Sequence, residues 1–222
     1  MKKASKPLVL INFKTYKEAA GKKALFLAKQ LVGIKENRYE IIVAPSLLTI
    51  KEIAERTKLK IFSQHADNVT LGAHTGSISI EELISIGVKG TILNHSEKKI
   101  PLHLLKETVE ICKNKKFTTV VCASTLSEIK KIAGLCPDYI AYEPKELIGG
   151  NISVTQSKPE IIIKAVELVK NLCPKAKLLC GAGVHSKEDL GQALLLGSEG
   201  VLIGHAVPKA KNPGKFLKEM LI

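Results

Sequence analysis

Residues 118–143, TTVVCASTLSEIKKIAGLCPDYIAYE, decide the fold class because they contain a complete strand–helix–strand unit. The apolar, β-branched run 118–124 predicts a buried strand. Thr125 and Glu128 follow with the spacing of a helix capping box. A second apolar run, 139–143, predicts the next strand. Two strands joined through a helix pair in parallel by a right-handed crossover.

The same alternation extends along the chain in both directions. Helical patterns such as 17–36 and 101–116 lie between strand patterns, and two further helix starts are marked by Ser157 with Glu160 and by Asn212-Pro213. The predicted strands are eight in number: 8–14, 40–46, 60–67, 90–97, 118–124, 139–143, 177–184 and 200–207.

Eight such units without a dividing linker predict an α/β fold, a closed (βα)8 barrel, formed as a single domain over residues 1–222. Many of the strands are continuously apolar, as parallel strands covered on both faces are. The alternative is an open, doubly wound sheet. That alternative is weaker because no G-x-G-x-x-G motif follows the first strand.

The chain has a formal charge of +13, almost all of it from lysine. The lysines are scattered and few aromatic residues accompany them, so we expect a solvated basic surface that also steers an anionic substrate. Binding to nucleic acid is the alternative, and a salt-dependent shift of random duplex DNA would support it. No apolar run is long enough for a membrane span or a signal peptide. We therefore expect a cytoplasmic protein with no membrane or nucleic-acid partner.

The five cysteines form neither a CxxC pair nor a metal-ligand spacing. Each lies in an apolar context, which favours small buried thiols. The sequence leaves open whether any of them pair. No metal site is predicted.

Polar residues cluster where predicted strands end, which is where a (βα)8 barrel builds its active site. The first strand ends in Asn12-Phe13-Lys14, and the strand period of two would point Asn12 and Lys14 to the same side. The fourth strand ends in 94–97, NHSE. The sixth ends in Glu143, a carboxylate that is costly to bury unless it is used.

Glycines follow these residues in two places. The loop after Glu143 carries Gly149-Gly150, which would allow it to move as a lid. Gly181-Ala182-Gly183 and Gly204-His205-Ala206 end the last two strands, where backbone N–H groups of barrels often hold a phosphate. A carboxylate base, a neutral imidazole, a lysine and a phosphate cradle fit proton abstraction beside a carbonyl.

These segments resemble the triosephosphate isomerase family, in its short archaeal form, which has the TIM-barrel fold. The resemblance runs along nearly the whole chain and is carried by 11–16 (INFKTY), 64–67 (QHAD), 72–77 (GAHTGS), 93–97 (LNHSE), 141–144 (AYEP), 146–149 (ELIG) and 180–184 (CGAGV). It implies interconversion of dihydroxyacetone phosphate and D-glyceraldehyde 3-phosphate in glycolysis and gluconeogenesis, without a cofactor.

The resemblance also implies roles for single residues. Glu143 would be the base that shuttles the proton, His95 the neutral electrophile held by a helix N-terminus, and Lys14 the electrostatic cation. Glu97 would support them. The residues implied to contact substrate or phosphate are Asn12, Phe13, Lys14, Ile148, Gly183, Gly204 and His205.

Segment 64–77 resembles the loop with which the family packs against a neighbouring subunit. It implies self-association, a homotetramer rather than a dimer, and it assigns His65 and His74 to an interface or the core. The chain departs from the family pattern at Lys145, at Gly149-Gly150-Asn151 and at Gly204-His205-Ala206, where relatives usually carry Ala-Ser-Gly.

Two other phosphosugar enzymes are alternatives. An epimerase would need metal-ligating His and Asp residues on several strand ends, and that pattern is missing. A Schiff-base aldolase would need a lysine inside a middle strand, and the predicted strands four to seven carry lysine only at their edges.

Overall fold

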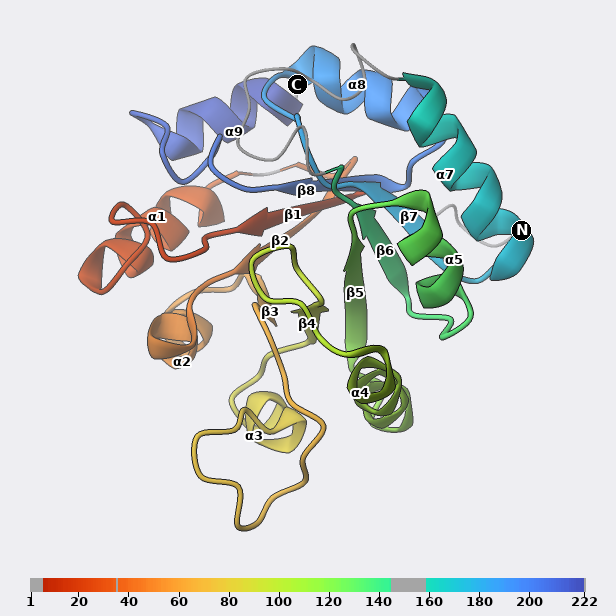
Figure 1. Cartoon of the computed structure of the whole chain (residues 1–222). Helices are drawn as coiled ribbons and strands as arrows, with labels where there is room; N and C mark the ends of the chain where they lie inside the picture. The colour runs from red at the N-terminus through yellow and green to blue at the C-terminus, as the bar shows by residue number, and fades with distance from the viewer. Residues whose placement is uncertain (1–5, 35, 145–158, 222) are drawn as a thin grey trace.

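The computed structural model describes residues 6–34, 36–144 and 159–221. Its strands form a closed parallel barrel in the order β1-β2-β3-β4-β5-β6-β7-β8 (Figure 1). The strands are β1 Leu8–Asn12, β2 Glu40–Ala44, β3 Lys60–Ser63, β4 Gly90–Leu93, β5 Thr118–Ala123, β6 Tyr139–Tyr142, β7 Lys177–Cys180 and β8 Gly200–Ile203. The closed barrel is confirmed, and the open sheet is wrong because β8 pairs with β1.

Helices cover the outside of the barrel (Figure 1). Those in the described residues are α1 Lys22–Val32, α2 Leu47–Arg56, α3 Ile80–Ser85, α4 Leu102–Asn114, α5 Leu126–Ala133, α7 Pro159–Leu172, α8 Lys187–Leu195 and α9 Pro213–Leu221. None of them is long and apolar enough to cross a membrane.

Two of the predicted helix caps are present. The Thr125 hydroxyl accepts the backbone N–H of Glu128 at the start of α5, and Asn212 Oδ1 accepts that of Lys215 at the start of α9. The Glu128 carboxylate accepts the N–H of Ser124. The predicted cap at Ser157 lies outside the described residues.

Every strand begins at its predicted residue and ends earlier than predicted, by one residue in β6 and by four in β3. Apart from Asn12, which is the last residue of β1, the polar residues that were assigned to strand ends therefore lie in the loops that follow. Lys14 illustrates the reason, since its φ of 47° is left-handed and incompatible with a strand. Asn94 has a similar φ of 56°. Asn12 and Lys14 do line one pocket, as predicted, but strand period is not the reason, because β1 ends at Asn12.

Side chains alternate between the two faces of each strand. Leu8 and Leu10 of β1 point into the barrel and pack with inward residues of the other strands, such as Phe62 and Ile92. The alternate residues, such as Val9, pack under the helices in the larger core cluster. Both faces are apolar, as expected of a parallel sheet that is covered on each side.

Gly200 lies at the seam where β8 meets β1. It pairs with Leu8, and its φ of 147° is one that other residues rarely adopt. A Cβ at this position would lie 2.1 Å from the carbonyl oxygen of Leu8. The barrel can therefore close at this point only with a glycine.

A disulfide joins Cys136, after α5, to Cys173, after α7, with their Cα atoms 5.7 Å apart. The two helices lie side by side (Figure 1). The interpretation of all five cysteines as thiols is therefore wrong for this pair, because packing of α5 on α7 brings together residues 37 apart in sequence. Cys112, Cys122 and Cys180 are free and buried, as expected.

Candidate active site

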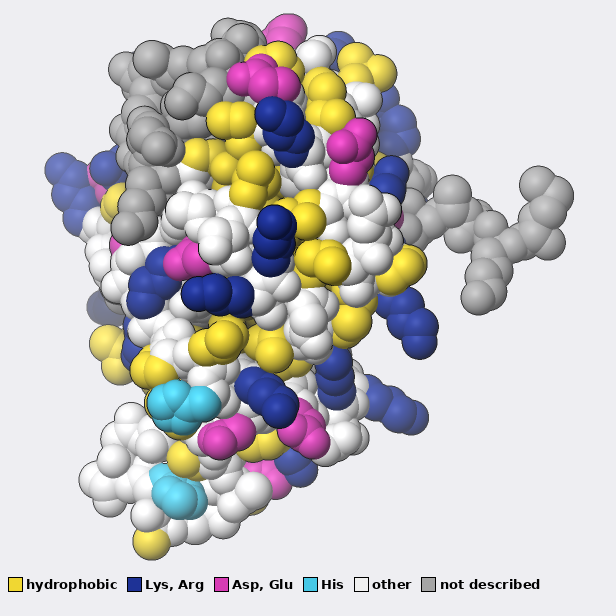
Figure 2. Space-filling model, turned by 45° about the vertical axis from the view of Figure 1, so that its right-hand side comes forward, with side chains coloured by type: hydrophobic (Ala, Val, Ile, Leu, Met, Phe, Trp, Pro, Cys, Tyr) yellow, Lys and Arg dark blue, Asp and Glu magenta, His cyan; other side chains and the backbone are white. Residues whose placement is uncertain are grey.

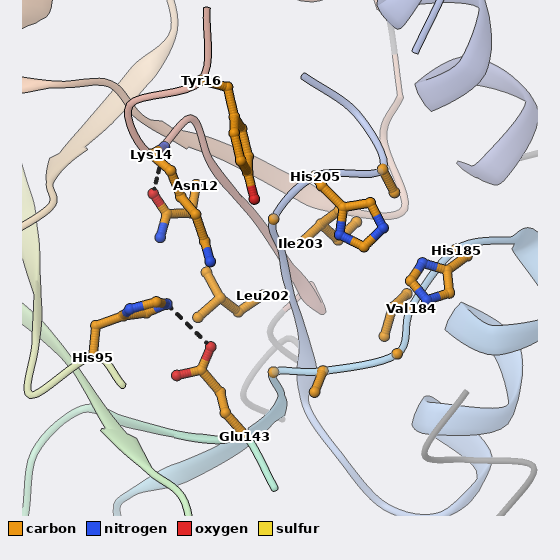
Figure 3. Close-up of a pocket in the computed structure, with 15 residues that line it drawn as sticks. Asn12, Lys14, Tyr16, His95, Glu143, Val184, His185, Leu202, Ile203 and His205 are labelled. Carbon is orange, nitrogen blue, oxygen red and sulfur yellow. Dashed lines mark hydrogen bonds and ion pairs between the residues drawn. The ribbon is translucent and has the colours of Figure 1, made fainter. Parts of the chain in front are cut away.

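A pocket opens at the carboxyl ends of the strands, where predicted site residues from five strands meet (Figure 3). Lys14 and Tyr16 come from the loop after β1, His95 from the loop after β4 and Glu143 from the end of β6. The rest of the lining is Asn12, Gly181, Ala182, Gly183, Val184, His185, Leu202, Ile203, Gly204, His205 and Ala206.

Lys14 is fixed in its left-handed conformation by neighbouring amides. Asn12 Oδ1 accepts the Lys14 backbone N–H at 2.9 Å. Gln64 Nε2 donates to the carbonyl of Lys14 at 3.0 Å and to that of Ala44 at 2.9 Å, which ties the loop to β2. The Lys14 ammonium lies 2.6 Å from Glu97 Oε1. The cation is thus held at the pocket while its own charge is partly balanced by Glu97.

His95 is buried, and its hydrogen bonds define its tautomer. Its Nδ1 accepts the backbone N–H of Glu97 at 3.2 Å, so in the neutral ring the proton lies on Nε2. Nε2 points across the pocket toward Glu143 (Figure 3). The donor to Nδ1 belongs to a turn over residues 95–98, before α4 begins at Leu102. A turn, rather than the helix N-terminus of the prediction, therefore holds this ring.

Glu143 is 4% exposed. Its Oε1 lies 3.3 Å from His95 Nε2, and its Oε2 has no hydrogen-bond partner among the described residues. A buried carboxylate oxygen without a partner is costly and is ready to accept a proton. The thiol of Cys122 lies nearby, and burial together with the Glu143 charge raises the pKa of this thiol well above its ordinary value. Cys122 therefore stays protonated.

The opposite side of the pocket is built from the ends of β7 and β8. Gly183 has a φ of 66°, which favours glycine. The next residues cap α8, where Asp189 Oδ2 accepts the backbone N–H of His185 at 2.8 Å and that of Ser186 at 3.1 Å. Those two amides are therefore used within the protein. The imidazoles of His185 and His205 lie beside each other on this side (Figure 3).

The structure brings most of the predicted site residues to this one pocket. Phe13 is fully buried in the outer core and does not line it. Ile148, Lys145 and the Gly149-Gly150-Asn151 tip lie outside the described residues. Glu97 reaches the pocket's lysine and histidine but is itself 58% exposed at its side chain.

Sequence reasoning gave no role to three residues at this site. Tyr16 and His185 line the pocket, and Gln64 ties down Lys14. Tyr16 closes the motif 11–16 of the family resemblance and His185 directly follows the motif 180–184, and these positions are the sequence signal that could have found them. Among the described residues, no three His, Cys, Asp or Glu side chains are grouped as a metal ion would require.

A buried carboxylate, an oriented imidazole and a lysine at the carboxyl end of a closed parallel barrel are the groups expected of a (βα)8-barrel enzyme that transfers protons. The comparisons with known proteins make this class specific. The family model for triosephosphate isomerase matches residues 7–220. The chain belongs to the triosephosphate isomerase family.

Several archaeal relatives cover almost the whole chain. The triosephosphate isomerase of Methanobrevibacter smithii is 40% identical over 97% of this chain and 97% of its own length. That of Methanocaldococcus jannaschii is 40% identical over 96% of this chain and 98% of its own. That of Methanothermus fervidus is 39% identical over 97% of this chain and 98% of its own length. The family resemblance of the sequence motifs is thereby confirmed.

Proposed function

We propose that this chain interconverts dihydroxyacetone phosphate and D-glyceraldehyde 3-phosphate through an enediolate, as an aldose–ketose isomerase (EC 5.3.1.1) of glycolysis and gluconeogenesis. The observation that carries the proposal is the buried contact of 3.3 Å between His95 Nε2 and Glu143 Oε1. A base and an electrophile this close can act on adjacent atoms of one small substrate.

The steps follow from the geometry. Glu143 removes a proton from the carbon beside the carbonyl, and its Oε2, which is buried without a partner among the described residues, is free to accept that proton. His95 Nε2–H donates to the substrate oxygen as negative charge develops there. Lys14 stabilises the same charge. Glu143 then returns the proton to the neighbouring carbon, while His95 Nε2 gives its proton to one enediolate oxygen and takes the hydroxyl proton from the other, so that no net proton is consumed.

The decisive experiment is NMR of dihydroxyacetone phosphate in deuterated water, with wild type and Glu143→Gln compared at equal concentration. Wild type should form product and exchange the C1 proton, and the variant should do both about 10²–10⁴ times more slowly. If wild type performs neither faster than the variant, the proposed reaction is wrong. Circular dichroism of both proteins checks that the substitution leaves the fold intact.

The self-association of the chain is also proposed, with a homotetramer favoured over a dimer. The loop between β3 and α3 extends away from the barrel (Figure 1) and carries Leu71, which is 68% exposed. Leu48, at the start of α2, is 96% exposed. A second interface, which a tetramer needs, has apolar residues available at Phe26 and Leu195. Light scattering of wild type and Leu71→Asp tests this: a variant of unchanged mass would exclude the loop from the interface.

A single domain over residues 1–222 and a cytoplasmic location complete the proposal. A cytoplasmic location has to be compatible with the Cys136–Cys173 disulfide. Structural disulfides are rare in the reducing cytosol outside hyperthermophiles. Trapping of thiols during cell lysis would show whether the bond exists there. On the face in Figure 2, basic side chains are dispersed among acidic and apolar ones, which supports a solvated surface over a nucleic-acid site.

A further inference from the structure

Two histidines lie together on the phosphate side of the pocket. The ring centroids of His185, after β7, and His205, after β8, are 5.1 Å apart, and the rings are tilted by 46°. Both line the pocket that holds His95 and Glu143, and they lie on the side away from that pair (Figure 3). Two titratable rings therefore face the end of the pocket where backbone binding of phosphate is expected.

The surroundings of this histidine pair are basic. Burial, then the neighbouring His185, Lys209 and Lys14, lower the pKa of His205 below its ordinary value. Lys209 also lies over the Tyr16 ring, 4.4 Å from its centroid. On α8, the Asp189 carboxylate accepts backbone N–H groups at the helix cap. An anion that entered between the rings would meet positive charge from Lys14 and Lys209.

One ring nitrogen of the pair is buried without a partner. His185 Nε2 is shielded from solvent and makes no hydrogen bond with the described residues. An unsatisfied buried polar atom costs on the order of 1–3 kcal/mol, and such atoms commonly mark a site that a ligand completes.

We propose that His185 and His205 bind the phosphate group of the substrate through their imidazole N–H groups and take up protons as the anion enters. The inference rests on the proposed function, because it assumes a phosphate ester in this pocket. The histidine pair supplies titratable side-chain donors in addition to backbone N–H groups. No covalent bond changes, and each proton taken up comes from solvent.

The direction of the pH dependence follows from linkage. In the free protein, burial and then the basic surroundings lower the pKa of His205 and so favour its neutral ring. A bound dianion raises the pKa of both rings, because opposite charge favours the protonated form. Anion affinity therefore increases as the pH falls through the pKa of the bound state. It levels off below the pKa of the free state, and above both values it is constant.

Sulfate is the suitable probe, because its charge stays constant over the range in which histidine titrates, whereas a phosphate ester titrates near pH 6. Calorimetry would measure sulfate binding between about pH 5.5 and pH 8 for wild type, His185→Gln, His205→Ser and the double variant. His103→Gln is the matched control, because His103 is an exposed residue of α4 that does not line the pocket.

For wild type we expect the sulfate Kd to fall by at least about tenfold as the pH is lowered from about 8 to about 5.5, since each linked proton contributes up to tenfold per pH unit. The double variant should change by about twofold or less, and the control should match wild type. An equal pH dependence in wild type and the double variant would overturn the inference.

A second measurement covers the case in which the double variant fails to fold. NMR titration of wild type should show that sulfate raises the pKa of two of its six histidines, and unchanged values would overturn the inference. Neither measurement needs turnover. An inactive wild type with the expected sulfate linkage would remove the proposed reaction and leave the histidine pair. Full isomerase activity without that pH linkage of sulfate binding would keep the proposed reaction and overturn the inference about the histidine pair.

Discussion

The two sides of the pocket are built on different principles. On the proton-transfer side, Lys14, His95 and Glu143 present side chains that backbone and amide contacts hold in place. On the opposite side, where we expect phosphate to bind, glycines at the ends of β7 and β8 let the backbone line the pocket, and the rings of His185 and His205 lie beside each other. The first side has one fixed arrangement, which the chemistry of proton transfer requires. In our proposal the second side gains charge by taking up protons when an anion enters.

The strongest test of this contrast concerns the coupling of His95 with Glu143. His95→Gln and Glu143→Gln should each lower kcat/KM by about 10²–10⁴-fold. The double variant should lose little more than the worse single variant, because the two residues act on one transition state. Steady-state kinetics of the four proteins gives the answer. When His205→Ser is combined with His95→Gln or with Glu143→Gln, the two fold-losses in kcat/KM should instead multiply. If the fold-losses of His95→Gln and Glu143→Gln also multiply with each other, the distinction between the two sides is removed.

Gly181 connects the two sides, and its substitution should have the next largest effect. A Cβ at Gly181 would lie 2.5 Å from Glu143 Cγ and 3.0 Å from the carbonyl oxygen of Tyr142. Gly181→Ala should therefore displace the base and lower kcat by about 10²-fold, the cost of a misplacement near 1 Å. Gly191→Ala in α8 is the matched control, because its Cβ would meet nothing within 4 Å. Equal kcat values for the two variants would contradict this account.

The disulfide links the segment between α5 and β6 to the end of α7. Reduction, or Cys136→Ser, should lower the free energy of unfolding by about 2–4 kcal/mol, the usual contribution of a natural disulfide. Urea unfolding with and without reductant measures the difference. The Cys136→Ser variant should be indifferent to reductant, and denatured wild type should expose three thiols rather than five. Five thiols in unreduced wild type would show that the bond does not form.

The smallest effect concerns stability rather than activity. The fold lowers the pKa of His205, chiefly through burial, so the folded state binds fewer protons than the unfolded state. Its free energy of unfolding therefore decreases as the pH falls below the unfolded value of about 6.5, until the pH passes the folded pKa. Urea midpoints of His205→Gln should decline less over this window than those of wild type, while His103→Gln should follow wild type. Parallel curves for all three proteins would refute the linkage.

Strand starts could be predicted from the sequence, and strand ends could not. Each strand begins at an apolar run or one or two residues before it, because burial on both faces sets that pattern. At the carboxyl end of a strand, polar residues directly follow the apolar run in sequence, but the backbone has already left the strand conformation. The left-handed φ of Lys14 depends on the Asn12 and Gln64 side chains, and this is a tertiary arrangement that periodicity does not record.

Pairs of residues that meet only in the folded barrel could not be predicted from the sequence either. Cys136 and Cys173 have no spacing that suggests a bond, because their proximity depends on how α5 packs on α7. His185 and His205 come from different strand ends. The residue types at the proton-transfer side were predictable because a carboxylate or an imidazole after a buried strand is unusual. At the phosphate side, single glycines are a weaker signal.

The glycine seam between β1 and β8 has a consequence for folding. Leu8 and Gly200 pair across almost the full length of the chain, so this contact is among the most non-local in the molecule and its formation is slow. Lys14 follows one strand of the seam and His205 follows the other. During refolding, secondary structure can form before the ring closes, but the complete pocket cannot. Regain of activity should therefore lag behind the far-ultraviolet signal and report the moment at which the two ends of the chain meet.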